Sequence, residues 1–98
     1  MQKARKVELV FVENKLRKDV ISMIEANAHE LACWALSCHG HAMYPHYHLV
    51  LSLKKPSDFS DIAQSFGVSV GCVNRYRCSF DDMVKYISQN GKYPVLKG

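Results

Sequence analysis

Polar and apolar residues alternate along the segment from His46 to Leu53, a pattern that predicts a half-buried β-strand. Alternate residues of a strand share one face. His46 and His48 therefore project to one side, whereas Tyr47 and three leucines project to the other. We expect the leucine side to face the core, which leaves both imidazoles on the opposite side of the sheet.

The same reasoning predicts an element order of β-α-β-β-α-β-α. Strands are expected over residues 6–14, 31–39, 46–53 and, with an interruption at Gly71, 68–77. Helical spacing of apolar residues predicts helices over 16–31, from the N-cap Ser57 to Gly67, and from Ser79 to Gly91. This order predicts an α+β, ferredoxin-like split βαβ fold with an antiparallel sheet and an additional C-terminal helix carrying Tyr86.

Composition adds the size and charge of the molecule. With 98 residues, 48% of them hydrophobic, the chain is expected to form one globular domain. The net charge of +4 favours a polyanionic partner. We expect no signal peptide and no membrane span, because the apolar runs are too short. The four cysteines form no CxxC pair, which is typical of free thiols in a reducing cytoplasm.

Histidines concentrate around the strand described above, since four of the five fall between positions 39 and 48. The parity of the preceding strand puts His39 on the same side as His46 and His48, and antiparallel pairing brings them close. Three imidazoles could then hold a divalent metal ion. His41, in the connecting loop, is the competing third ligand, and solvated histidines without a metal are the simpler alternative.

Tyr86 stands out on the last predicted helix. It lies roughly 110° from the centre of the apolar stripe, given the 3.6-residue period, so we expect it at the flank of the helix rather than in the core. A phenol there could reach the histidines along the sheet surface. Gln89 and Asn90 lie one turn further on the same side and could bind substrate. The alternative is a boundary tyrosine that covers the edge of the core.

The run Pro45-His46-Tyr47-His48, followed by an apolar strand and a later helix with Val84-Lys85-Tyr86, resembles the HUH endonucleases. It is similar to the nuclease domain of rolling-circle plasmid replication initiators. The resemblance implies a metal-dependent endonuclease that nicks and rejoins single-stranded DNA, or an origin hairpin, through a 5′-phosphotyrosine on Tyr86. It implies Mn²⁺ or Mg²⁺, with Zn²⁺ as an option, and a cytoplasmic location in the host of a plasmid or virus.

Within the resemblance, His46 and His48 are the metal ligands. No carboxylate occurs between Glu30 and Asp58, so His39 is expected as the third ligand. Lys92 occupies the place nearest to that of an auxiliary lysine. Relatives often continue into oligomerisation or helicase regions, which allows for a further C-terminal domain in a longer parent protein.

Basic residues supply a candidate DNA-binding surface. Arginines flank Tyr76, an arrangement that could combine phosphate contacts with base stacking. The basic candidates are Lys3, Arg5, Lys6, Lys54, Lys55, Arg75 and Arg77. Two other functions stay open. One is a non-enzymatic nucleic-acid-binding module of ferredoxin-like fold. The other is a small structural zinc protein that uses Cys38 together with His39, His46 and His48.

Overall fold

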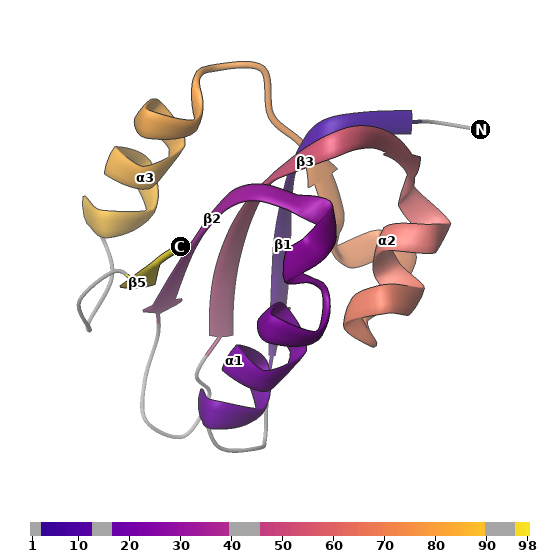
Figure 1. Ribbon diagram of the computed structural model, residues 1–98. Helices are drawn as coiled ribbons and strands as arrows, with labels where there is room; N and C mark the ends of the chain where they lie inside the picture. Colours follow the sequence, from indigo (N-terminus) through magenta and orange to yellow (C-terminus); the bar gives the residue numbers. More distant parts are fainter. Residues whose placement is uncertain (1–2, 13–16, 40–45, 90–95) are drawn as a thin grey trace.

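The computed structural model describes residues 3–12, 17–39, 46–89 and 96–98. Within these ranges the chain forms an α+β fold with an antiparallel sheet in the strand order β4-β1-β3-β2-β5 (Figure 1). The elements are β1 (Lys3–Val12), α1 (Arg17–Ala26), β2 (Leu31–His39), β3 (His46–Asp58), α2 (Phe59–Phe66), β4 (Val73–Arg75), α3 (Phe80–Gln89) and β5 (Leu96–Lys97), with 3₁₀ turns over Ala28–Glu30 and Val70–Cys72. The order confirms the ferredoxin-like prediction, and the short β5 is an addition to it.

The two faces of the sheet carry separate hydrophobic clusters. On the first face, side chains of α1 and α2 pack with Tyr47, Leu49, Leu51 and Leu53 of β3, as the alternation predicted. On the second face, α3 packs through Met83 and Ile87, with Ala35, Val50 and Tyr76 completing the cluster. The sheet is therefore covered on both sides. The second face is the one that carries the two histidines.

The start of α2 differs from the prediction. Ser57 was expected as its N-cap, but β3 continues to Asp58, and Asp58 is the N-cap instead. The reason is strand pairing, because Ser57 lies opposite Ala4 of β1 and Asp58 lies opposite Lys3. The helix ends as predicted at Gly67, whose φ of 66° is the left-handed conformation that glycine adopts without steric cost.

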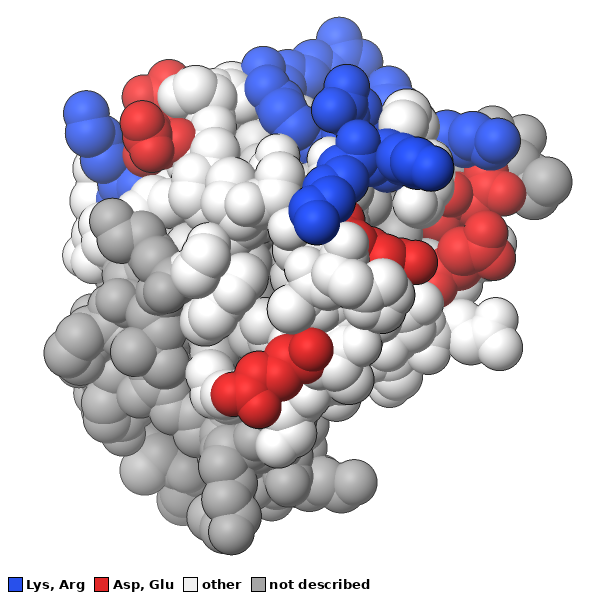
Figure 2. All heavy atoms as spheres, in the orientation of Figure 1, with Lys and Arg blue, Asp and Glu red and all other residues white. Residues whose placement is uncertain are grey.

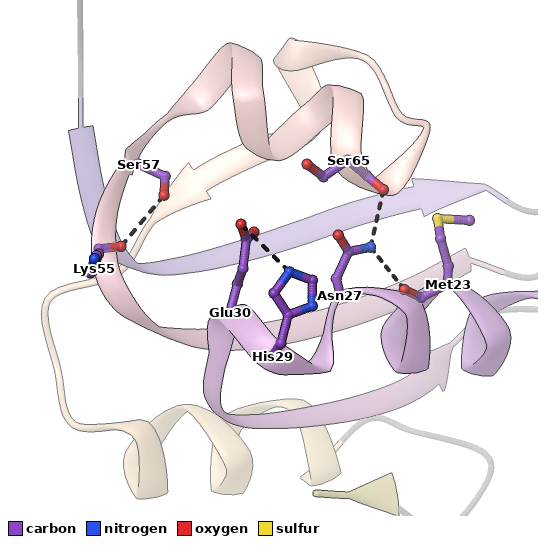
Figure 3. A network of polar contacts seen from close by, with 7 residues as sticks. All are labelled: Met23, Asn27, His29, Glu30, Lys55, Ser57 and Ser65. Atoms are coloured by element: carbon purple, nitrogen blue, oxygen red, sulfur yellow. Dashed lines mark hydrogen bonds and ion pairs between the residues drawn. The ribbon is translucent and has the colours of Figure 1, made fainter.

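The predicted first helix also ends sooner than expected, at Ala26 instead of Leu31. Asn27 follows, and its side-chain amide donates to the carbonyl oxygens of Met23 at 2.9 Å and Ser65 at 3.2 Å. Figure 3 shows this amide between α1 and the end of α2. A side chain that bonds to nearby backbone competes with continued helix, and here it also ties the two helices together.

The last helix begins where the sequence indicated. Ser79 Oγ accepts a hydrogen bond from the backbone N–H of Asp82 at 3.1 Å, so Ser79 caps α3. By contrast, the fourth strand shrinks from the expected 68–77 to Val73–Arg75, because a 3₁₀ turn takes its first half. No helix in the described ranges is long and apolar enough to cross a membrane.

Tyr76, expected to stack on bases at the surface, is instead a buried residue. Only 7% of it is exposed, and its hydroxyl donates to the carbonyl oxygen of Leu51 at 3.1 Å. The prediction of base stacking by this ring is therefore wrong. Desolvation by burial, with smaller contributions from Cys33 and Cys78, raises the pKa of Tyr76 to about 12.

This buried phenol makes stability depend on alkaline pH. The unfolded chain releases the phenol proton near pH 10 and the folded chain only near pH 12. The stabilisation is therefore complete below pH 10 and is lost as the pH rises toward 12. We expect the free energy of unfolding of the wild-type chain to fall more steeply there than that of Tyr76→Phe, by up to about 1.4 kcal/mol per pH unit. Urea titrations at several pH values measure this difference, and parallel pH profiles would contradict it.

Candidate functional site

The two histidines predicted as a pair lie at the start of β3, on the second face of the sheet. Their rings are neighbours, with centroids 5.3 Å apart and planes at 60°. Both side chains are partly buried, whereas Tyr47 between them is buried in the opposite face. The alternation of the strand thus puts the imidazoles and the leucines on opposite faces of the sheet, as the sequence indicated.

A carboxylate that the sequence reasoning missed completes this site. Glu8 lies on β1, which pairs with β3 in the sheet, and its Oε2 is 2.9 Å from Nδ1 of His48. The two side chains are 13% and 15% exposed, so the pair is largely shielded from water. A neutral His48 that donates from Nδ1 to Glu8 keeps its lone pair on Nε2, the nitrogen that could then bind a metal.

The signal for Glu8 was present in the sequence. Glu8 is a single charged residue inside the apolar run from Val7 to Val12. A carboxylate within a central strand is rarely buried without a partner. Only the strand order, which places β1 beside β3, identifies that partner as His48.

We expect Glu8 and His48 to be energetically coupled. Either single change to Ala leaves a partly buried charged or polar group without its partner, which costs about 1–3 kcal/mol. A double-mutant cycle should therefore give an interaction energy of about 0.5–3 kcal/mol. Urea unfolding of the Glu8→Ala, His48→Ala and double variants measures it. Additive effects of the two substitutions would show that the contact contributes nothing to stability.

The helix that bears Tyr86 is anchored beside the histidines. Ser37 of β2 lies directly opposite His48 in the register, and its buried hydroxyl donates to the carbonyl oxygen of Ile87 at 3.2 Å. Ile87 is itself fully buried, whereas the preceding residue, Tyr86, is 55% exposed. The last turns of α3 therefore cover the strand next to His48, and Tyr86 sits at the flank of the helix, as predicted.

Other expected site residues are placed less completely. His39 lies opposite His46 in the strand register, while its side chain lies outside what the structure describes. His41, Asn90 and Lys92 lie outside the described residues altogether. Gln89 is exposed at the end of α3, three residues beyond Tyr86.

The donors on this face are chemically suited to a divalent cation. Two imidazoles and a carboxylate are the ligand types that Mn²⁺ and Zn²⁺ accept in proteins. Within the described ranges no three His, Cys, Asp or Glu side chains already surround a common point. Among the residues that the structure describes, His46 and His48 are thus the candidate metal ligands, and Glu8 orients His48 through its contact with Nδ1.

The alternative zinc site is wrong in one of its ligands. Cys38 is 5% exposed and belongs to the cluster on the first face of the sheet. It therefore points away from His46 and His48, which lie on the second face. All four cysteines are free thiols, as the sequence predicted.

The basic candidates gather at the other end of β1. The side chains of Lys54, Lys55, Arg75 and Arg77 are all exposed. Figure 2 shows Lys and Arg atoms grouped along the upper part of the molecule, above the end of the sheet where β1 begins.

Comparison with known proteins adds no relative to this description. The sequence matches no protein-family model and no curated protein.

Proposed function

We propose that this protein is a metal-dependent endonuclease that nicks and joins single-stranded DNA, and that it initiates rolling-circle replication. One observation carries the proposal: the helix bearing Tyr86 is fixed, through Ser37 and Ile87, to the strand beside His48. The helix that covers the histidine face carries a half-exposed phenol, and a phenol and metal-binding imidazoles are the groups that phosphodiester transesterification needs.

In the proposed reaction Tyr86 is the nucleophile. Its oxygen forms a bond to the scissile phosphorus as the bond from phosphorus to the 3′ oxygen breaks. The phenol loses its proton and the departing oxygen gains one, which leaves a 5′-phosphotyrosine and a free 3′-OH. Because one phosphodiester replaces another, a 3′-OH can attack the phosphotyrosine and rejoin the strand without ATP.

The histidines prepare the phosphate for this exchange. His46 and His48 would hold a divalent cation, Mn²⁺ or Mg²⁺ with Zn²⁺ as an option, which supplies Lewis-acid polarisation of the phosphate when bound. Glu8 positions His48, since its carboxylate fixes the ring through Nδ1. His39, opposite His46 in the register, is the proposed third ligand.

Formation of a covalent adduct tests the proposal. The protein is incubated with mixed-sequence single-stranded oligonucleotides and Mn²⁺, and the products are separated on a denaturing gel. We expect a protein–DNA adduct that EDTA prevents. Absence of any adduct over a broad set of sequences and metals would overturn the proposed function.

A further inference from the structure

The end of β1 remote from the histidines has an irregular register. Ala4 pairs with Ser57 and Lys6 with Ser52, so the four residues from Leu53 to Pro56 lie opposite Arg5 alone. The usual alternation is broken on β1 as well, since Ala4 and Val7, three positions apart, both belong to the core. Both residues between them, Arg5 and Lys6, are consequently kept out of the core.

This irregularity gathers cations from three strands and from the segment that follows β4. Seven of the 13 lysines and arginines of the chain lie here, and we call them the basic corner: Lys3, Arg5, Lys6, Lys54, Lys55, Arg75 and Arg77. Backbone carbonyl oxygens hold three of them in place. Arg5 donates to Lys54 at 3.2 Å, Arg75 donates to Lys3, and Lys6 donates to Arg77 at 3.5 Å.

No carboxylate of the described residues forms an ion pair with a member of the basic corner. Their ion pairs are His29–Glu30 and His48–Glu8, and neither includes a member of the basic corner. Asp58 lies opposite Lys3 in the register, yet its buried Oδ1 has no hydrogen-bond partner. The corner thus gathers positive charge on seven side chains, three of which backbone carbonyl oxygens hold.

The cations also line a common hollow. Lys3, Arg5, Lys6 and Arg75 form its walls together with Pro56 and Tyr76, and the hollow has a volume of about 370 Å³. Lys6 lies with its Nζ 5.6 Å from the centroid of the Tyr76 ring. A shallow hollow bordered by several cations is suited to phosphate oxygens rather than to a single carboxylate.

The hollow and the histidine pair lie along one face of β1. Lys6, Glu8 and Val10 alternate onto the second face, and Val10 lies opposite His48. The four residue-to-residue steps from Lys6 to Val10 span roughly 14 Å at about 3.4 Å per step.

We propose that the basic corner binds the phosphate backbone of the DNA substrate away from the scissile phosphate, independently of the metal. The inference rests on the proposed function and adds a second contact to it. Such a contact would give affinity and orientation without reading sequence, because phosphates are the same at every position.

Salt dependence of binding in the absence of chemistry tests this inference. Fluorescence anisotropy is measured in EDTA with a Tyr86→Phe chain and a labelled mixed-sequence single-stranded oligonucleotide, at increasing KCl. Adding Arg5→Gln and Arg75→Gln should make the slope of log K against log[salt] shallower by about 1.4, since each lost contact to single-stranded DNA removes about 0.7. Arg5→Lys with Arg75→Lys, which retains the charge, should keep most of the slope.

Two further variants make the result specific. Lys54→Gln with Lys55→Gln changes exposed side chains of the same corner. This lysine variant is used for the measurement if the double arginine-to-glutamine variant has a lowered melting temperature. Lys85→Gln removes an exposed cation on α3, outside the corner. An unchanged slope of log K against log[salt] in both corner variants would overturn the inference. So would a change of slope per removed charge in Lys85→Gln that equals the change in the corner variants. Binding of the chain to anionic vesicles without binding to DNA, measured in the same way, would also overturn it.

The two proposals fail separately. Corner-dependent DNA binding without a covalent adduct would refute the nuclease and leave the binding surface intact. A covalent adduct together with a slope that the corner variants do not change would support the nuclease and refute the binding surface.

Discussion

Tyr86→Phe is expected to abolish the covalent protein–DNA adduct, lowering the rate of strand cleavage by at least about 10³-fold, as removal of an essential nucleophile does. The substitution deletes one oxygen from a side chain that is 55% exposed. Packing of α3 rests on Met83 and Ile87, which stay in place, so the melting temperature should change little. Adduct formation on denaturing gels and single-turnover cleavage measure the effect.

Tyr93→Phe is the matched control, because Tyr93 is the other tyrosine near the C-terminal end of the chain. Its place between Gly91 and Pro94 disfavours a position within a helix, so it is the weaker candidate nucleophile. We expect this variant to retain adduct formation. An adduct that survives Tyr86→Phe and disappears in Tyr93→Phe would move the nucleophile to Tyr93 and refute the role given to α3.

Ile87→Ala should have the largest effect on stability among changes near the site. Ile87 is fully buried between α3 and the sheet, and truncation of such a side chain costs about 2–5 kcal/mol. That loss is a large part of the total stability of a small domain. We also expect cleavage to weaken, because the turn that carries Tyr86 loses the packing that holds it over β2.

Val70→Ala provides the comparison for Ile87→Ala. Val70 is an aliphatic residue that is 53% exposed, so its truncation should alter the free energy of unfolding by no more than about 0.5 kcal/mol. Urea denaturation of both variants measures the contrast. A loss below about 1 kcal/mol in Ile87→Ala would mean that α3 is not packed firmly on the sheet.

Periodicity was sufficient to predict the faces of the sheet and the flank position of Tyr86. Alternation along β3 separated His46 and His48 from the leucines because a strand in a covered sheet has only two sides. Helical spacing separated Tyr86 from Ile87 because successive helical residues differ by about 100°. Both inferences depend only on residues close together in the chain, which is why they succeeded.

Contacts between distant segments were not predictable in the same way. Glu8 is 40 positions from His48 and lies well before the stretch between Glu30 and Asp58 that contains the histidine strand. The arginines on both sides of Tyr76 favour, from the sequence alone, an aromatic residue at the surface. An extended segment with one buried side gives the same sequence pattern, and in the structure Tyr76 is buried while Arg75 and Arg77 are exposed. Strand order decides between these interpretations, and local patterns do not contain it.

The shortness of β4 has a consequence for association between copies of the chain. This outer strand pairs with only Val7, Leu9 and Glu8 of β1, so it shields a small part of its neighbour. Unpaired backbone groups along such a strand can hydrogen-bond to a strand of another chain, and charged side chains, lysine above all, discourage this pairing in natural proteins. A second copy joining alongside the first residues of β1 would bring Lys3, Arg5 and Lys6 against like charges. The cations assigned to DNA therefore also oppose self-aggregation, and bound nucleic acid would neutralise that repulsion.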